Sequence, residues 1–263
     1  MSELLRSPVL AALGVAHGFN LRTGGVSAPP YASFNLGRSV GDDPAAVATN
    51  IERFARALCT EPERLFTSSQ VHGAAVRVVC AAEDVANVRA VEADALATAE
   101  PGLAVGIRVA DCVPVVLIDV ASGVVGAAHA GWRGVVQEVV PRALERVLGL
   151  GGDRARSAQT HAAIFPHIRA CCFEVGEEVA EPLAACAAQA GVTGDAVIDR
   201  SRGKPHIDLA AIVRGQLLAA GVPAAQIDDV AGCTRCEPER FFSFRREGRR
   251  SGRHIAAIVA PKR

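Results

Sequence analysis

The sequence lacks an excess of charge of either sign, because 28 basic side chains balance 28 acidic ones over 263 residues. A neutral chain has no bulk field to attract nucleic acid, an anionic membrane or acidic partners, so any anion site must be local. We therefore expect no nucleic-acid partner and no membrane association, and nothing in the sequence indicates an obligate protein partner.

A membrane-spanning run and a targeting leader are also missing. The apolar run from Val9 to Val15 is short, has no basic leader before it and is soon followed by polar sequence, unlike a signal peptide or a membrane span. The eight cysteines are spread through a chain far longer than a disulfide-built miniprotein, which favours a reducing compartment. We expect a cytoplasmic protein.

Neither a fixed-period repeat nor a low-complexity linker interrupts the chain. Half of the residues are hydrophobic and 21% are charged, a composition that excludes disorder, coiled coil and collagen. A chain of this length buries about three quarters of its unfolded surface. We expect a single domain over residues 1–263.

Helical and strand patterns alternate along this chain. The first helix should open with Asp43 as N-cap and Pro44 at its first position, whereas Pro141 should kink or split a later one. Apolar spacing predicts helices at residues 44–58, 136–148, 174–189 and 208–220. Strands are expected in the β-rich runs at residues 74–80, 103–109, 113–120, 123–130 and 254–260. The third and fourth of these should form a hairpin, so the class is α/β with mixed rather than all-parallel sheets.

Three residues stand out where a strand meets a loop: His72 in QVHG, Cys112 in ADC and His129 in HAGW. A hairpin turn centred at Val120 and Ala121 would place residues whose numbers sum to 241 opposite each other, and so pair Cys112 with His129. Two imidazoles and a thiolate suit Zn²⁺, and three protein ligands leave a fourth position for water, as in catalytic zinc sites. The hairpin register does not predict where His72 lies.

The neighbouring residues permit two interpretations each. Asp111 either orients an imidazole of the site or caps a loop at the strand end. Arg133 and the backbone amides of the GWRG segment offer a local phosphate site, unless the glycines only shape a tight turn beneath Trp132. By the plainest interpretation, Cys112 is a small hydrophobe and the histidines are only hydrogen-bonded.

The remaining cysteines give no zinc pattern. Cys233 and Cys236 form a single CxxC without a second pair at suitable spacing, so we predict ordinary thiols. Cys171 and Cys172 are adjacent, and we predict that they pack into the core on alternating faces.

A series of motifs spans almost the whole chain in one order. They are HGFNLRTGGVS at 17–27, FNLG at 34–37, VGDDP at 40–44, SSQVHG at 68–73, ADAL at 93–96, ADCVPV at 110–115, AHAGWRG at 128–134, CCFEVG at 171–176 and FFSFRREGRRSGR at 241–253. By these motifs the chain resembles the bacterial laccase-domain, or polyphenol oxidoreductase, family, whose members are also called purine nucleoside phosphorylases.

The resemblance implies a single four-layer α/β/β/α domain with mixed sheets and one zinc ion per chain, held by His72, Cys112 and His129 as metal ligands and catalytic residues. It implies phosphorolysis of adenosine, inosine, guanosine or methylthioadenosine, and hydrolytic deamination of adenosine. Purine nucleosides and phosphate would then be the partners of the site.

Three further positions are expected to bind substrate, namely Arg133, Asn35 in the FNLG motif and Asp111. Two positions depart from the family pattern. Ile51 follows Asn50 where members commonly have arginine, which removes a cation, and Phe165 replaces glycine, which puts a ring where a backbone could approach a ligand.

Two other chemistries compete with the zinc enzyme. Cys112 could act as a thiolate nucleophile with His129 as its base, in a metal-free hydrolase or deamidase. A copper-dependent polyphenol oxidase, suggested by the family's older name, needs several copper sites, and the seven histidines form no clustered His-X-His set. A metal-binding or partner-binding module without catalysis is the non-enzymatic alternative.

Overall fold

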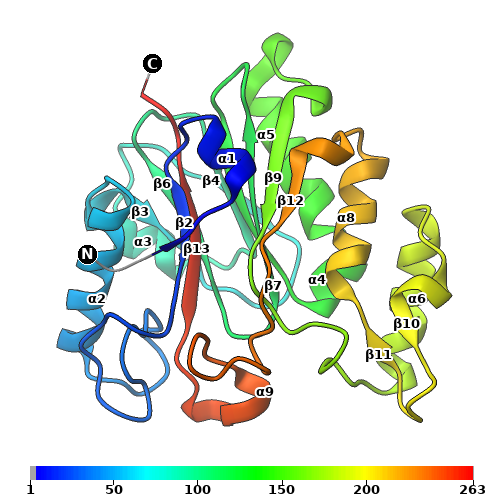
Figure 1. The fold of residues 1–263 in the computed structure, drawn as a ribbon. Helices are drawn as coiled ribbons and strands as arrows, with labels where there is room; N and C mark the ends of the chain where they lie inside the picture. The colour runs from blue at the N-terminus through cyan, green and yellow to red at the C-terminus, as the bar shows by residue number, and fades with distance from the viewer. Residues whose placement is uncertain (1–3, 263) are drawn as a thin grey trace.

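The computed structural model describes residues 4–262, which fold into four layers (Figure 1). Two sheets face each other in the middle. Helix α2 (Pro44–Ala57) covers the outer face of the first sheet, on the left of Figure 1, and helices α4 (Trp132–Val136), α5 (Val139–Gly151), α6 (Glu177–Gln189) and α8 (Leu209–Ala219) cover the second. The expected α/β class and its α/β/β/α layering are confirmed, whereas the single domain stays a prediction.

Both sheets are mixed. The first has the strand order β1 (Leu4–Leu5), β2 (His17–Asn20), β13 (His254–Val259), β6 (Ala104–Val109) and β3 (Leu65–Phe66). The second has the order β12 (Ile227–Asp229), β9 (Thr160–Ile164), β7 (Val113–Asp119), β8 (Val125–Ala130), β5 (Ala95–Thr98) and β4 (Val76–Val78). Neighbours are antiparallel except β3 with β6, β9 with β12 and β4 with β5.

The other α-helices and strands of the described chain are short. They are helices α1 (Pro8–Ala12), α3 (Val85–Ala90), α7 (Gly194–Val197) and α9 (Phe244–Glu247), and a ribbon of β10 (Ile198–Asp199) with β11 (His206–Ile207). Within residues 4–262, no helix has both the length and the apolar character that crossing a bilayer requires.

The central strands are buried on both faces, which explains their continuous apolar runs. Along β13, Ile255 and Ala257 pack toward α2, while Ala256 and Ile258 belong to the core between the sheets. Successive side chains of a strand point to opposite faces, so one strand serves two cores. A strand of this kind shows no polar alternation in its sequence.

The predicted start of α2 is confirmed, and α8 has end signals of the same kind. The Asp43 carboxylate accepts a hydrogen bond from the amide of Ala45, and Pro44 is the first residue of α2. In α8, the Asp208 carboxylate caps the first turn, and Gly221 lies just past the end with a φ of 89°. These signals act within a few residues, which is why the sequence predicts them.

Two predicted helix positions are corrected. The helical run after His129 is split at Glu138, whose φ is 62°, and not at Pro141. Pro141 is the third residue of α5. A backbone N–H at this position has no acceptor within the helix, so proline removes no helical hydrogen bond there. Helix α6 begins at Glu177 and not at Glu174, because Glu174 is extended and bridges to the strand segment at His206.

The β7–β8 hairpin forms, but the predicted register is wrong. Pro114 lies opposite His129, so paired residues sum to 243 and not to 241. The turn is displaced by one residue because the amide of Gly123 donates to the Asp119 carbonyl over 2.8 Å. Because the sum of paired residue numbers changes by two, each side chain stays on the same face of the sheet as in the predicted register. Cys112 lies just beyond the paired part of β7, diagonally across from His129.

His254 is a buried structural residue at the start of β13. Its Nε2 accepts from the amide of Phe242 and its Nδ1 donates to the carbonyl of Asn20, both over 2.8 Å, and its ring stacks on Phe19. Burial lowers the pKa of His254 to about 3, because the interior disfavours the imidazolium and the hydrogen bond to Asn20 only partly offsets this.

This buried imidazole should make the fold sensitive to acid. Its folded-state pKa lies below the ordinary 6.5, so the unfolded chain binds the proton more readily and the free energy of unfolding falls as the pH decreases below 6.5. One proton corresponds to a slope of about 1.4 kcal/mol per pH unit. In urea unfolding near pH 5, His254→Gln should reduce the slope by up to this amount.

Phe242→Leu is the matched control, since it loosens the same packing without removing a titratable group. It should lower the free energy of unfolding at every pH and leave its pH dependence unchanged. An equal slope in His254→Gln and the wild type would contradict the assignment.

Candidate metal centre

The structure brings His72, Cys112 and His129 together at one end of the second sheet. Their ligating atoms all lie within 4.8 Å of one another. Cys112 Sγ is 3.9 Å from His72 Nε2, and the two imidazole rings are 4.9 Å apart between centroids. Sulfur and nitrogen ligands of one tetrahedral zinc ion lie about 3.6 Å apart. The three side chains therefore fit a zinc ion after a small adjustment.

Unusual backbone conformations make this approach possible. His72 and Asp111 both have a left-handed backbone, with φ values of 61° and 94°, which non-glycine residues rarely adopt outside functional sites. Gly131 lies opposite, where a Cβ atom would be 2.9 Å from the His72 ring and 3.3 Å from Cys112 Sγ. Only glycine leaves room for both ligands.

Asp94 organises the site, and the sequence reasoning missed its role. Its carboxylate accepts the backbone amides of Val71, His72 and Gly73 over 3.1, 3.0 and 2.8 Å, and His129 Nδ1 lies 2.7 Å from Oδ1. With Nδ1 donating to Asp94, His129 presents Nε2 to a metal. The sequence feature that could have indicated this role is the acidic residue at the start of the otherwise apolar ADAL segment.

Burial alone would raise the pKa of the Asp94 carboxyl, but its hydrogen bonds reverse the shift. The His129 ring and the amide of Gly73 stabilise the carboxylate, so its pKa is lowered below the ordinary value. Asp94 therefore remains charged beside the two imidazoles near neutral pH.

Cys112 and His129 influence each other's ionisation. Loss of water would raise the pKa of the thiol and lower that of the imidazole, but each charge stabilises the other. As a result the pKa of Cys112 is lowered to about 6 and that of His129 is raised to about 9, with Asp94 adding to the second shift. These shifts favour a thiolate paired with an imidazolium when no metal is bound.

Asp111 does not orient an imidazole. Its carboxylate accepts from the Thr234 hydroxyl and from the amide of Arg245, each over 2.6 Å. Asp111 therefore connects the Cys112 segment to the loop between β12 and β13. Its side chain also lines a cavity beside the three candidate ligands.

The three candidate ligands open into a cavity of about 580 Å³. This is a suitable volume for a small organic ligand. Five arginines line it, and three aromatic rings add apolar surface. The arginines are Arg38, Arg108, Arg133, Arg245 and Arg253, and the rings are Trp132, Phe173 and Phe244. The cavity therefore gathers positive charge in a protein of no net charge, and the binding of an anion there stays a prediction.

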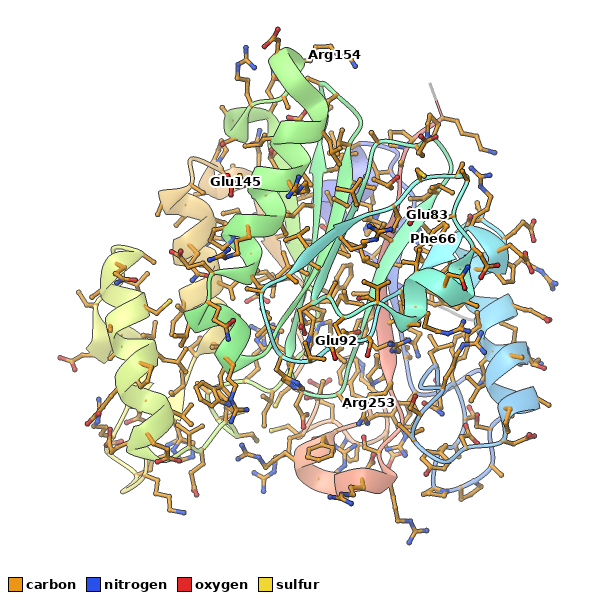
Figure 2. All side chains as sticks on the ribbon, turned by 180° about the vertical axis from the view of Figure 1, so that it is seen from behind. Phe66, Glu83, Glu92, Glu145, Arg154 and Arg253 are labelled. Carbon is orange, nitrogen blue, oxygen red and sulfur yellow. The ribbon has the colours of Figure 1, made fainter. Side chains whose placement is uncertain are left out.

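The arginines of the cavity crowd one another. The pKa of Arg108 is lowered to about 10 by burial and by the positive charges of Arg89, Arg38 and Arg253. Arg253 lies next to α9 (Figure 2), with its guanidinium 5.7 Å from the Phe244 ring. Arg133 stacks on Trp132 at 4.4 Å. An anion in the cavity would relieve this repulsion.

Asn35 lies behind the cavity wall and is not among the lining residues. It is fully buried, and its Oδ1 accepts from the amides of Gly37 and Arg253, both over 2.8 Å. Its amide group donates to Asp42 over 2.8 Å. The structure places Asn35 where it positions Gly37 and Arg253, and direct contact with substrate stays a prediction.

The two departures from the family pattern also lie outside this cavity. Ile51 packs into the core between α2 and the first sheet. Phe165 is buried between the sheets, and its ring stacks on Phe19 at 5.9 Å. The expectation that the Phe165 ring lies where a backbone could approach a ligand is therefore wrong for this cavity.

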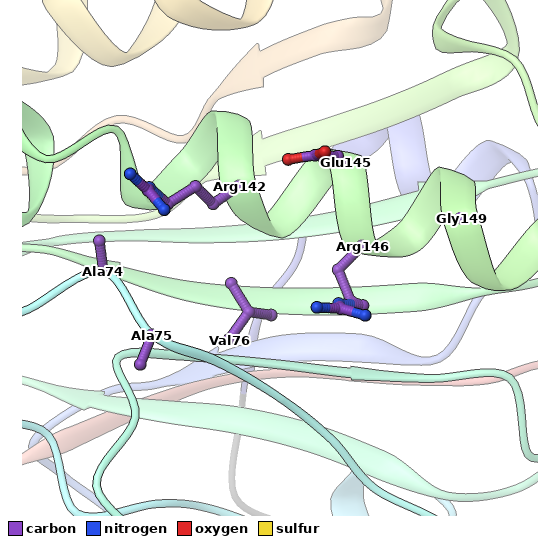
Figure 3. A pocket seen from close by; sticks show the side chains of 7 residues that line it. All are labelled: Ala74, Ala75, Val76, Arg142, Glu145, Arg146 and Gly149. Carbon is purple, nitrogen blue, oxygen red and sulfur yellow. The ribbon is translucent and has the colours of Figure 1, made fainter.

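A second hollow, of about 380 Å³, lies between α5 and the edge strand β4 (Figure 3). Arg142, Glu145 and Arg146 line it together with small apolar residues. None of the three candidate ligands reaches it, so it is separate from the candidate metal centre.

The structure also brings four other cysteines together, and it corrects the prediction that both Cys171 and Cys172 pack into the core. The sulfur atoms of Cys171, Cys172, Cys233 and Cys236 lie within 4.8 Å of one another. Cys171 and Cys236 are exposed, whereas Cys172 and Cys233 are buried. Sequence spacing could not reveal this group, because its two pairs lie about sixty residues apart and meet only in the fold.

Known proteins resemble this chain over nearly its full length. The family described as "Multi-copper polyphenol oxidoreductase laccase" matches residues 16–261. A purine nucleoside phosphorylase of Deinococcus radiodurans is 42% identical over 261 residues, covering 99% of this chain and 94% of that protein. Adenosine deaminase RL5, from an unknown prokaryotic organism, is 38% identical over 233 residues, or 87% of each chain. The crystal structure of YlmD from Geobacillus stearothermophilus has a TM-score of 0.87 at 32% identity, covering 98% and 96%.

Asp94→Asn should weaken metal binding. The amide has a similar shape, but it carries no charge to stabilise the donor hydrogen of His129, and its NH2 group cannot accept a hydrogen bond as the carboxylate oxygen does. Loss of such a partner typically lowers metal affinity by about 10–100-fold. Competition for Zn²⁺ between the protein and a chelator measures this.

Asp119→Asn is the control, because Asp119 is an equally buried carboxylate that accepts backbone amides at the far end of the β7–β8 hairpin. It should reduce the free energy of unfolding and leave the affinity for the ion unchanged. Equal losses of affinity in both variants would mean that Asp94 acts only through stability.

Proposed function

The chain belongs to the family described as multi-copper polyphenol oxidoreductase laccase, and from this premise we propose that it is a zinc-dependent enzyme of purine nucleosides. The proposed reactions are phosphorolysis of adenosine, inosine, guanosine or methylthioadenosine, and hydrolytic deamination of adenosine. The similarity to relatives named purine nucleoside phosphorylase and adenosine deaminase supports it. The observation that carries it is the meeting of His72, Cys112 and His129 in an arginine-lined cavity.

His72 Nε2, Cys112 Sγ and His129 Nε2 would hold the ion. Zn²⁺ bound there would supply Lewis-acid polarisation and a means of activating water near neutral pH. One sulfur and two nitrogen ligands suit a zinc ion. A copper oxidase, in contrast, needs several copper sites. Among residues 4–262, the other cluster of three or more ligating side chains is made of cysteines alone, so it is not a histidine-rich copper centre.

For phosphorolysis, a phosphate oxygen forms a bond to the ribose C1′ while the bond from C1′ to the base nitrogen breaks. The arginines of the cavity supply the positive charge that binds phosphate, with Arg133 held in place by its stacking on Trp132. The departing base gains negative charge, which the same cationic surface stabilises. Trp132, Phe173 and Phe244 offer flat apolar faces for the purine ring.

For deamination, water adds to C6 of adenine and ammonia leaves. A proton must therefore move from the water to the departing amine. Asp111 is the carboxylate among the described residues that line the cavity, and its position beside Cys112 makes it the candidate for this transfer.

We also place the enzyme in the cytoplasm, because a reducing compartment keeps Cys112 free.

The metal-free hydrolase is the second candidate function. It is favoured by the closeness of Cys112 Sγ to a ring nitrogen of His129, within 4.8 Å, which lowers the pKa of the thiol and raises that of the imidazole. The two functions differ in their response to reagents. Chelation should abolish turnover by the zinc enzyme, whereas the metal-free enzyme would survive chelation and lose turnover on alkylation of its thiol.

Cys112→Ala should remove one metal ion per chain and abolish turnover. Elemental analysis of the purified protein would be combined with assays of adenosine and inosine, each with and without phosphate. Cys59→Ser, at an exposed cysteine, is the control and should retain both metal and turnover. Turnover that survives Cys112→Ala would contradict the proposed site.

Arg133→Ala should weaken phosphate binding selectively. A hydrogen bond to a charged group contributes about 1.5–3 kcal/mol, so the KM for phosphate should rise by roughly tenfold or more. Deamination of adenosine without phosphate should change much less. Arg142→Ala, in the separate hollow of Figure 3, is the matched control and should change neither reaction. An unchanged phosphate KM in Arg133→Ala would place the phosphate elsewhere.

A further inference from the structure

The clustered cysteines come from two loops at one edge of the second sheet. Cys171 and Cys172 lie in the turn that follows β9, and Cys233 and Cys236 lie in the loop that follows β12. Because β9 and β12 are parallel neighbours, the loops after their carboxyl ends meet. The amide of Thr234 donates to the His167 carbonyl over 3.0 Å and fixes the two loops to each other.

The sulfur atoms have the separations of a tetrahedral metal site. Cys171 Sγ is 3.7 Å from each of the other three sulfurs, and Cys172 Sγ is 3.2 Å from Cys236 Sγ. Four sulfurs bound at 2.3 Å around one zinc ion lie about 3.8 Å apart. A disulfide would need about 2.05 Å. The group therefore already has nearly the size of a four-thiolate cage.

Hydrogen-bond donors surround two of the four sulfurs. Backbone amides of Arg169, Arg235 and Cys236 face the sulfur of Cys233. The Arg235 guanidinium lies beside the sulfur of Cys172. Four thiolates around one divalent cation carry an excess of negative charge, and these amides and the Arg235 guanidinium partly offset it.

We propose that Cys171, Cys172, Cys233 and Cys236 bind a second zinc ion in a closed structural site. A tetrahedral set of four sulfurs is typical of zinc or of iron–sulfur centres, and it leaves no open position for a substrate. This site is distinct from the centre at Cys112 and does not depend on the proposed nucleoside chemistry.

The second ion would stabilise one wall of the catalytic cavity. Thr234, between the two cysteines of the CxxC pair, donates its hydroxyl to Asp111. Phe173 follows Cys172 and lines the cavity. The zinc ion would thus hold the loops that position Asp111 and Phe173 without touching the substrate.

Metal content of the full-length protein tests the proposal. Elemental analysis should find two zinc ions per chain in the wild type, one in Cys233→Ser/Cys236→Ser and one in Cys112→Ala. Cys59→Ser/Cys80→Ser, with two substitutions outside both clusters, should keep two. A double variant at Cys233 and Cys236 with as much zinc as the wild type would overturn the proposal.

The same experiment tests the two proposed sites independently. If Cys112→Ala keeps both ions, the proposed catalytic centre is wrong while the cysteine site stands. If Cys112→Ala loses its only ion, the catalytic centre stands and the cysteine site is overturned.

Thiol reactivity of the wild-type protein provides a second test that needs no variant. Cys59, Cys171 and Cys236 are all exposed. In the protein as purified, an alkylating reagent with mass-spectrometric readout should modify Cys59 and spare Cys171 and Cys236. After chelation all three should react, and added Zn²⁺ should restore the protection. Equal reaction of the three before chelation, or disulfides among the clustered cysteines, would overturn the proposal.

Discussion

The site depends on one buried carboxylate. Asp94 has no exposed surface, and it is stable there because three backbone amides and one imidazole donate to it. The same hydrogen bonds hold the left-handed loop of His72 and fix the ring of His129. The two candidate nitrogen ligands thus share a single anchor, and a buried charge without its full set of donors would destabilise the positions of both.

The cavity combines groups from both sheets. The candidate ligands Cys112 and His129 come from the ends of β7 and β8 in the second sheet, whereas Arg108 lies on β6 and Arg253 precedes β13 in the first. The apolar core between the sheets therefore sets the distance between the candidate metal ligands and the arginines of the cavity. Packing far from the chemistry determines the geometry of the site.

The cysteines occupy two kinds of environment. Cys112 lies beside two imidazoles, with room for a ligand, while the four clustered cysteines surround a small volume of their own. Thr234 and Asp111 link these environments through a single hydrogen bond of 2.6 Å. A closed structural site next to an open one would combine a rigid wall with a reactive centre.

Local signals determined much of the fold from the sequence alone, including the Asp43 cap, the buried strand runs and the mixed class, because each acts within a few residues. The motifs also pointed to Cys112 and its two histidines. Only the tertiary structure decided the hairpin register, the helix break at Glu138, the anchoring role of Asp94 and the gathering of the four cysteines. These features depend on which distant segments pack together, and that is a property of the whole core and not of any short stretch of sequence.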